Sequence, residues 1–264
     1  MIELIHIGKK AKDLVLNVGS FIRSEASQFD NAKIEYKGLN DMVSYVDKEA
    51  EKQLVEGLKI ILPEAGFITE EGTAHATDED YKWIIDPLDG TTNFLHGLPV
   101  YSISVALMYQ HTLVLGIVYE INKEELFYAH KNGGAFLNDK PIFVSPIKEL
   151  NKSLLATGFP IHTFDQLGEY VELLQYFMKN THGLRRLGSA AVDLAYVACG
   201  RVEGFFEYNL NPWDVAGGAF IVQEAGGVVT DFNGGNDYLF GKSIIAAGKV
   251  NKELSSVIKG IWNK

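Results

Sequence analysis

The stretch that decides this chain's fold and chemistry reads Trp83-Ile84-Ile85-Asp86-Pro87-Leu88-Asp89-Gly90-Thr91-Thr92-Asn93-Phe94. An apolar strand here ends in two carboxylates, Asp86 and Asp89, and a glycine-threonine turn follows at once. Hard divalent cations such as Mg²⁺ prefer oxygen ligands, so this pair could hold one or two such ions. If a helix begins near Thr91, its first N–H groups and positive dipole end point toward an anion. The stretch therefore indicates a metal site beside a phosphate site.

The composition indicates a folded, acidic protein. Its 264 residues are 47% hydrophobic, which suffices for one large core or two closely packed ones. The formal net charge of −10 argues against nucleic acid or an anionic membrane as the main partner. No apolar run reaches the roughly 18 residues that a membrane span needs. The single cysteine, Cys199, excludes an internal disulfide, and without a signal-like apolar block at the start we expect a reduced, cytoplasmic location.

Two amphipathic helices are predicted in the first quarter of the chain. Apolar residues at helical spacing run from Leu4 to Ile22, and a second stripe runs from Val46 to Ile61. Ser44 and Asp47 have the spacing of a capping box at the start of the second helix. Short strands are then expected at 67–69, 82–85, 101–109, 113–119 and 125–129, with turns at 111–112 and 122–123.

Beyond about residue 150 the pattern alternates between strand and helix. Strands are expected at 154–157, 183–186, 203–207, 228–230 and 243–247, and helices at 165–179, 189–198, 213–225 and from about 250. Two helices over an antiparallel sheet, followed by an alternating α/β half, predict a layered α/β sandwich. We place a boundary near residue 145, with halves 1–145 and 146–264 packed as one compact unit.

Further acidic residues have both a structural and a functional interpretation. Glu70 follows a predicted strand and could reach the cations of Asp86, although an acidic pair with Glu71 is ordinarily solvated surface. Asp214 lies in the first turn of an apolar helix, where it could simply complement the helix dipole. Asp47 has the capping role as its structural alternative.

Two other patterns are rejected as sites. Gly241-Lys242-Ser243 resembles the end of a phosphate-binding loop, but Asn236 occupies the position of the required first glycine and a strand follows. The histidines show no His-x-His or His-x-x-x-His pair, so zinc has little support. Arg185 and Arg186 could touch a phosphate, or could be solvated.

Taken together, these segments resemble the inositol monophosphatase family. One family signature is matched by residues 83–94, and the other by Trp213-Asp214-Val215-Ala216-Gly217-Gly218-Ala219 with Glu224-Ala225-Gly226-Gly227. The family's remaining site segments are matched by 40–44 with Asp47, by 67–71 and by 188–193, so the resemblance covers nearly the whole chain. Tyr36-Lys37-Gly38-Leu39-Asn40, which we expect to form a loop, is closer to the bacterial type.

The resemblance implies a five-layer αβαβα sandwich, of the type shared with fructose-1,6-bisphosphatase, and a homodimer. It also implies a lithium-sensitive phosphatase that uses two or three Mg²⁺ ions. Its implied metal ligands are Glu70, Asp86, Asp89, Asp214 and the carbonyl of Leu88. Its implied catalytic residues are Asp47, Thr91 and Glu70. The implied substrate contacts are Asp89, Gly90, Thr91, Ala190, Glu207 and Asp214, and an exposed strand-edge charge is the alternative interpretation of Glu207.

The function expected from the resemblance is hydrolysis of myo-inositol 1-phosphate to inositol and phosphate by a metal-activated water. Uncatalysed phosphate-monoester hydrolysis is extremely slow, and cations offset the charge that repels the nucleophile, which explains the density of carboxylates. Fructose 1,6-bisphosphate and 3′-phosphoadenosine phosphates are alternative substrates on the same fold. A binding or regulatory protein without catalysis is the alternative of a different class. Thr92-Asn93-Phe94 favours the inositol branch over the nucleotidase branch.

Overall fold

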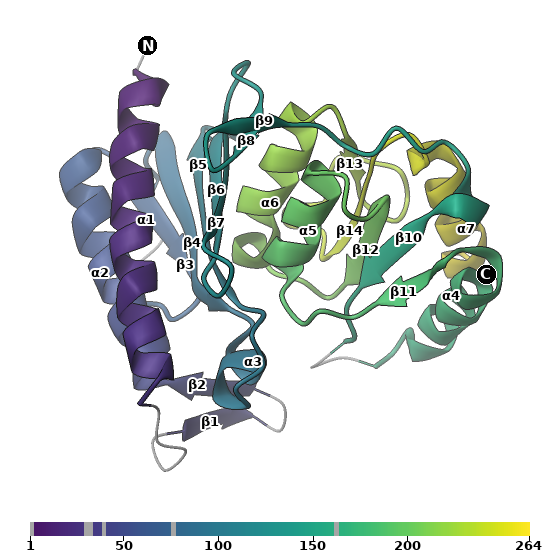
Figure 1. Cartoon of the computed structure of the whole chain (residues 1–264), viewed down its shortest axis with the longest axis horizontal. Coiled ribbons are helices and arrows are strands. Elements are labelled where there is room, and N and C mark those ends of the chain that lie inside the picture. Colours follow the sequence, from purple (N-terminus) through teal and green to yellow (C-terminus); the bar gives the residue numbers. More distant parts are fainter. Residues whose placement is uncertain (1–2, 29–33, 39–40, 75–77, 161–163) are drawn as a thin grey trace.

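Five layers of helices and sheets alternate along the long axis of the molecule (Figure 1). The computed structural model describes residues 3–28, 34–38, 41–74, 78–160 and 164–264. A helix pair, a seven-stranded sheet, a second helix pair, a five-stranded sheet and a third helix pair follow one another. The αβαβα sandwich expected from the resemblance is therefore confirmed.

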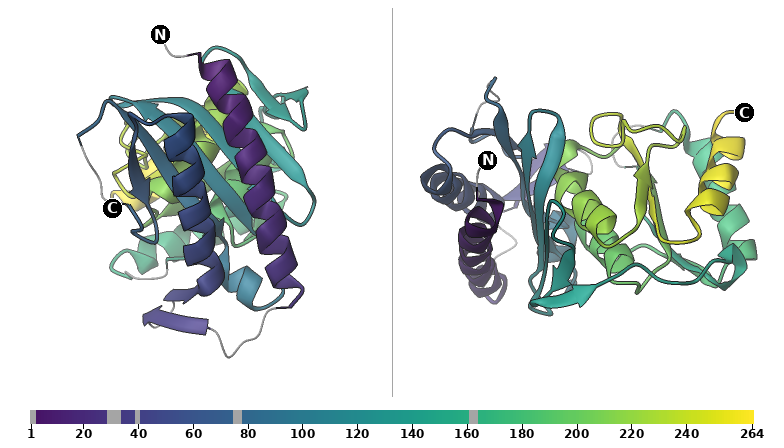
Figure 2. Two further views of the ribbon diagram at one scale, coloured as in Figure 1. Left: turned by 90° about the vertical axis from the view of Figure 1, so that its left-hand side faces the viewer. Right: turned by 90° about the horizontal axis from the view of Figure 1, so that it is seen from above.

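The outer helix pair at the N-terminal end is built from the two predicted amphipathic helices, α1 (Leu4–Ala26) and α2 (Tyr45–Ile61). Figure 2 shows them side by side on one face of the large sheet. The predicted capping box is present, because the Ser44 hydroxyl accepts from Val46 N–H (3.1 Å) and Ser44 N–H donates to Asp47 Oδ2 (2.8 Å). In the described part of the chain, no helix combines the length and apolarity needed to cross a bilayer.

The seven-stranded sheet follows chain order from β3 to β9. Its strands are β3 (Gly66–Thr69), β4 (Tyr81–Asp89), β5 (Ser102–Tyr109), β6 (Thr112–Glu120), β7 (Glu125–His130), β8 (Ala135–Leu137) and β9 (Lys140–Ile142). The expectation of an antiparallel sheet is wrong at one edge, because β3 and β4 pair in parallel. β8 and β9 were not predicted, since three residues are too few to show a period.

The turns of this sheet lie close to their predicted positions. The first turn lies at Gln110 and His111, with Gln110 at φ 54°, so it is one residue earlier than predicted and Thr112 already belongs to β6. The second turn spans 121–124 and includes the predicted 122–123. In the segment expected as a loop, β1 (Ile34–Gly38) pairs antiparallel with β2 (Asp41–Ser44), while Leu39 and Asn40 lie outside the described residues.

The central helices, α5 (Ala190–Ala198) and α6 (Pro212–Glu224), lie between the two sheets. A helix that is apolar on all sides is typical of such a position. A Cβ on Gly116 of β6 would lie 2.6 Å from the carbonyl oxygen of Gly217, so only glycine allows α6 to approach the sheet so closely. One hydrophobic cluster joins Ile84 to Phe220, so the proposed halves 1–145 and 146–264 share a core.

The five-stranded sheet has the order β11-β10-β12-β14-β13 and is covered on its outer face by α4 and α7. β10 is parallel to both of its neighbours, whereas β14 is antiparallel to β12 and β13. The bounds are β10 (Leu154–Thr157), β11 (Gly183–Arg185), β12 (Gly204–Tyr208), β13 (Val228–Thr230), β14 (Ser243–Ala247), α4 (Leu167–Asn180), α7 (Asn251–Trp262), and the short helices α3 (Thr91–Leu95) and η2 (Leu150–Lys152). Lys242 leads directly into β14, in agreement with the rejection of a phosphate-binding loop there.

Candidate active site

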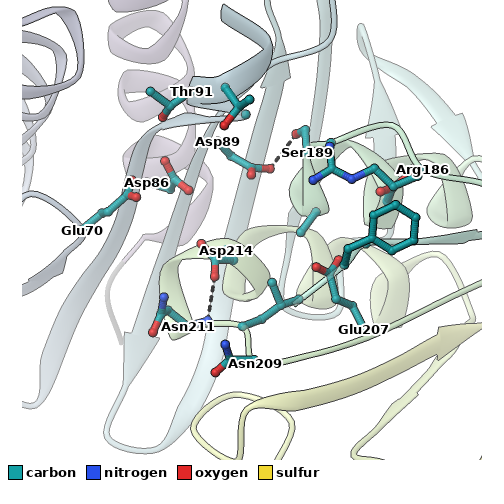
Figure 3. Close-up of a pocket in the computed structure, with 18 of the residues that line it drawn as sticks. Glu70, Asp86, Asp89, Thr91, Arg186, Ser189, Glu207, Asn209, Asn211 and Asp214 are labelled. Atoms are coloured by element: carbon teal, nitrogen blue, oxygen red, sulfur yellow. Dashed lines mark hydrogen bonds between the residues drawn. The ribbon is translucent and has the colours of Figure 1, made fainter. Parts of the chain in front are cut away.

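A pocket of about 160 Å³ opens where the end of β4 faces the N-termini of α5 and α6. The elements that surround it come from both halves of the chain, which explains why residues far apart in sequence meet there. Figure 3 shows several carboxylate side chains directed into this space. The predicted site residues that line it are Glu70, Asp86, Leu88, Asp89, Gly90, Thr91, Ala190, Glu207 and Asp214.

The end of β4 presents both of its carboxylates to the pocket. The pairing of β4 with β5 shifts register between Asp86 and Asp89, so the strand bulges there. Leu88 N–H donates to Asp86 Oδ1 at 2.9 Å, which fixes that carboxylate against the bulge. Bulges re-aim side chains in this way near active sites. The bulge thus explains how two predicted metal ligands on one short segment can both face the pocket.

Gly90 makes the turn between β4 and α3 possible. Its φ of 100° lies in the left-handed region, and a Cβ there would lie 3.1 Å from the carbonyl oxygens of both Gly188 and Val100. The hydrogen bonding of α3 begins with Phe94 N–H, which donates to the carbonyl oxygen of the N-cap residue Gly90 at 3.0 Å. The N–H groups at the start of a helix have no acceptor within the helix, so this turn offers donors to an anion.

Asp47 is the one predicted site residue that does not line the pocket, but it contacts the lining residue Thr91 directly. Thr91 Oγ1 lies 2.9 Å from Asp47 Oδ1 and 3.0 Å from the carbonyl oxygen of Leu88, and its one proton serves either acceptor. Asp47 Oδ2 accepts from the backbone N–H (2.8 Å) and the hydroxyl (2.6 Å) of Ser44. Burial raises the pKa of Asp47, while the bonds from Ser44 and Thr91 oppose the rise. One carboxylate therefore serves both as the helix cap and as the Thr91 partner.

Asp89 reaches the N-terminus of α5. Its Oδ2 accepts from the Ser189 hydroxyl at 2.6 Å (Figure 3) and from Ala191 N–H at 2.7 Å. Burial raises the pKa of Asp89 to about 6, against the lowering effect of these donors. These two bonds hold Oδ2 at the helix N-terminus, and they leave the other oxygen, Oδ1, available to the pocket.

Asp214 lies in the first turn of α6, as predicted. Its Oδ2 accepts from Asn211 N–H at 2.6 Å, which is the bond of a helix cap. Burial, followed by repulsion from Asp89, raises the pKa of Asp214 to about 7. The structural and functional interpretations are compatible, because the same side chain caps α6 and faces the pocket.

The pKa values of Glu70 and Asp86 are also strongly raised. Burial, and then the negative charge of neighbouring carboxylates, raises the pKa of each well above its ordinary value. In the described part of the chain, Glu70 Oε2 is buried without a hydrogen-bond partner. A solvated surface role for Glu70 is therefore wrong.

These observations test whether the residues fit a divalent cation. Within the described ranges, no three acidic, histidine or cysteine side chains already converge as a preformed metal centre. The pocket nevertheless combines an unpartnered buried oxygen with four carboxylates whose pKa values are raised by burial and, for Glu70, Asp86 and Asp214, also by neighbouring negative charge. An all-oxygen donor set of this kind suits Mg²⁺ rather than zinc, so the residues fit the ion that the resemblance implies.

Glu207 lies at the opposite wall of the pocket, at the end of β12. It is only 8% exposed, so its interpretation as an exposed edge charge is wrong. A Cβ on Gly158 would lie 2.0 Å from Glu207 Oε1, so that glycine leaves the room for the carboxylate. Burial and then the charge of Asp214 raise the pKa of Glu207, while Arg186 lowers it.

Several lining residues are absent from the predicted set, and three of them, Arg186, Ser189 and Asp193, carry a charged or hydroxyl side chain. Asp193 is 1% exposed, and among the described residues its Oδ1 has no hydrogen-bond partner. Its signal was visible in the sequence, since it is an acidic residue in the first turn of an apolar helix, like Asp214. Both arginines are exposed, but only Arg186 lines the pocket, whereas Arg185 donates to Leu184 O at 3.0 Å.

Comparison with known proteins assigns this arrangement to a family. Residues 5–263 match the model of the inositol monophosphatase family. The chain is 45% identical over 242 residues to a putative Nus factor SuhB of Neisseria meningitidis serogroup B, covering 91% of this chain and 92% of the relative. It is 39% identical over 236 residues to an inositol-1-monophosphatase of Mesorhizobium japonicum, covering 89% of each.

A solved structure agrees in fold. The extragenic suppressor protein suhB of Bartonella henselae superimposes with a TM-score of 0.90 at 39% identity, covering 96% of this chain and 98% of that one. The family match spans nearly the whole chain and includes every element that lines the pocket. This chain belongs to the inositol monophosphatase family.

Proposed function

We propose that the protein is a Mg²⁺-dependent phosphate monoester hydrolase that converts myo-inositol 1-phosphate and water to inositol and phosphate. The observation that carries the proposal is the pocket itself, in which the unpartnered oxygen of Glu70 and the carboxylates of Asp86, Asp89 and Asp214 face the Gly90 turn. Membership of a family named for this activity supports it. A homodimer in the cytoplasm, inferred from the resemblance and the composition, is part of the same proposal.

Five groups would hold two or three Mg²⁺ ions. When bound, these ions supply charge neutralisation for the phosphate, a lowered pKa for an attacking water and stabilisation of the leaving oxygen. The groups are the carboxylates of Glu70, Asp86, Asp89 and Asp214 and the carbonyl of Leu88. Asp89 and Asp214 each keep one oxygen bonded to a helix N-terminus, which fixes the direction of the other.

Asp47 and Thr91 would manage the proton of the attacking water. With Thr91 Oγ1 donating to Asp47 Oδ1 (2.9 Å), the lone pairs of that hydroxyl oxygen are free to accept from a water in the pocket. As the water oxygen bonds to phosphorus, its proton passes toward Thr91 Oγ1 and the Thr91 proton passes to Asp47 Oδ1. The raised pKa of Asp47 favours that transfer. The bond between phosphorus and the ester oxygen breaks, the ester oxygen takes a proton from solvent water, and Asp47 returns its proton to the solvent, so that alcohol and hydrogen phosphate are released.

The opposite wall would recognise the alcohol. Glu207 and the start of α5 at Ala190 line the pocket beyond Asp89 and Asp214. Carboxylate oxygens accept hydrogen bonds from hydroxyl groups, so this wall suits a polyol better than an apolar alcohol. The backbone N–H groups of Gly90 and Thr91 would bind the phosphate oxygens on the near side.

The names of several relatives favour a second candidate function. The Neisseria relative is named a putative Nus factor. If this chain shares that role, it would act as a Nus factor in addition to catalysis or in place of it. Complementation of a strain that lacks that relative separates the two roles. Rescue by the wild type and equally by Asp89→Asn would assign the rescued role to binding, whereas loss of rescue in Asp89→Asn would assign it to the pocket.

Phosphate release from a substrate panel tests the main proposal. The panel comprises inositol 1-phosphate, fructose 1,6-bisphosphate, 3′-phosphoadenosine 5′-phosphate and glycerol 2-phosphate, each with Mg²⁺ and with EDTA, and Asp89→Asn serves as the blank. Fastest Mg²⁺-dependent release from inositol 1-phosphate is expected. A preference for another member would overturn the substrate assignment, and no release above the blank would overturn catalysis.

A further inference from the structure

Glu51 is a buried carboxylate that none of the preceding steps uses. It lies in α2, one turn after Asp47, and is fully buried. Its Oε2 accepts from Glu71 N–H at 2.7 Å, and its Oε1 accepts from Thr73 N–H at 2.9 Å and from the Thr73 hydroxyl at 2.7 Å. All of these donors belong to the segment that directly follows Glu70.

The segment held by Glu51 is open around Gly72. Gly72, between the two anchored residues, has a φ of 71° and would have nothing within 4 Å of an added Cβ. On the other side of Glu70, the ladder between β3 and β4 ends with Glu70 N–H donating to Ile85 O at 3.3 Å. The backbone at Glu70 is therefore fixed between the sheet on one side and Glu51 on the other.

The Glu70 side chain needs that support. Its carboxyl group bonds to Asp86, another proposed metal ligand, but its Oε2 is buried and, within the described residues, has no hydrogen-bond partner, so no donor at that oxygen fixes its direction. We infer that Glu51 is a positioning residue, which holds the 71–73 segment so that the Glu70 carboxylate faces the Mg²⁺ site. This inference rests on the proposed function, because it concerns one of the proposed metal ligands.

Only a carboxylate fits this role. An ionised Glu accepts at both oxygens, and here donors approach both. Glutamine has nearly the same shape but offers one acceptor and one N–H₂ donor, so in Glu51→Gln either Glu71 N–H or the Thr73 donors would face another donor. The segment would shift, and Glu70 would shift with it.

Glu120 provides a matched control. It is 1% exposed, lies at the end of β6 and likewise holds the turn that follows. It accepts from Asn122 N–H (3.3 Å), from the Asn122 side-chain amide (3.2 Å) and from Lys123 N–H (2.6 Å). This turn contributes no residue to the pocket lining. Glu120→Gln therefore reproduces the local damage without a link to Glu70.

The test is calorimetric titration of the metal-free full chain with MgCl₂, without substrate. We expect the Kd of Glu51→Gln for Mg²⁺ to rise about tenfold, the scale found for groups that orient metal ligands, while that of Glu120→Gln stays within about twofold of wild type. Melting temperatures measured in parallel should fall similarly in both variants. A wild-type Kd in Glu51→Gln, or an equal rise in Glu120→Gln, would overturn the role of Glu51.

A milder variant covers the case in which Glu51→Gln does not fold. Thr73 is exposed, and Thr73→Val removes one of the three hydrogen bonds while keeping its shape. We expect a rise of about threefold in the Kd for Mg²⁺, the scale of one lost hydrogen bond. An unchanged Kd in Thr73→Val would then overturn the inference. If the wild type itself binds no Mg²⁺, the proposed metal site fails, which is a different outcome from wild-type binding that these variants leave unchanged.

Discussion

Carboxylates that hold turns and carboxylates that line the pocket have opposite surroundings in this molecule. Glu51 and Glu120 each accept three hydrogen bonds from the segment they hold. In the pocket, Glu70 leaves a buried oxygen unpartnered, and the pKa of Asp86 is raised by burial and by neighbouring negative charge. A buried carboxylate therefore stabilises the fold where it holds a turn, whereas in the pocket its burial costs stability.

The difference follows from the number of donors. A buried charge without hydrogen bonds or a counter-ion is unfavourable, and the surrounding structure must compensate for it. Such uncompensated, perturbed groups concentrate at functional sites. The pocket is therefore the region in which stability and activity should respond to substitution in opposite directions.

The largest expected effect tests that opposition directly. Asp214→Asn removes one of the crowded charges and one proposed metal ligand, and Asp89→Asn does the same on β4. Turnover of inositol 1-phosphate should fall about 10³-fold or more in either variant, the scale of losing one preorganised charge-stabilising group. The melting temperature in EDTA should stay equal to that of the wild type or rise, because repulsion is relieved. A clear fall in melting temperature would place these residues with Glu120 as structural carboxylates.

A smaller effect is expected from Thr91→Ala. The variant keeps every proposed metal-ligand side chain but removes the hydroxyl that joins the pocket to Asp47 Oδ1. The kcat should fall about 10²-fold, the lower range for proton transfer by a positioned group, with the Kd for Mg²⁺ changed by less than about threefold. Steady-state rates and calorimetry separate these quantities. Equal losses in both would mean that Thr91 supports the metal site rather than the proton path.

Glu207→Gln should affect recognition more than chemistry. Glu207 lies at the wall opposite the Gly90 turn and is not among the proposed metal ligands. The KM for inositol 1-phosphate should rise about tenfold, the range for one hydrogen-bonding contact, while the KM for glycerol 2-phosphate rises much less. Equal changes for the two substrates would remove Glu207 from polyol recognition.

The smallest effect is a pH dependence of stability in the metal-free protein. The pKa of Asp214 is raised from 3.8 to about 7, so the folded state keeps a proton that the unfolded state releases. This contribution is fully present below about pH 4 and is lost as the pH rises through about 7. The difference between the melting temperature of Asp214→Asn and that of the wild type, both in EDTA, should therefore increase by about 2–4 °C from pH 5 to pH 8. A difference independent of pH would contradict the raised pKa.

Most of the fold could be predicted from local patterns. The helical spacing of α1 and α2, the capping box at Ser44 and the strand that ends in Asp86 all depend on contacts within a few residues. Apart from Asp47, the predicted site residues line one pocket, but several were identified only through a family resemblance. Glu51 escaped prediction because a charged residue beside an apolar stripe is ordinarily solvated.

The sequence by itself determined the helices, the principal strands, the acidic turn at residues 86–91 and the family, because periodicity, caps and signatures are local properties of the chain. Only the tertiary structure decided that Glu207 is buried against Gly158, that Asp193 faces the pocket and that Glu51 holds the segment after Glu70. Each of these depends on elements that meet across the sandwich. Burial and hydrogen-bond partners arise only when such elements pack together, and so no local pattern specifies them.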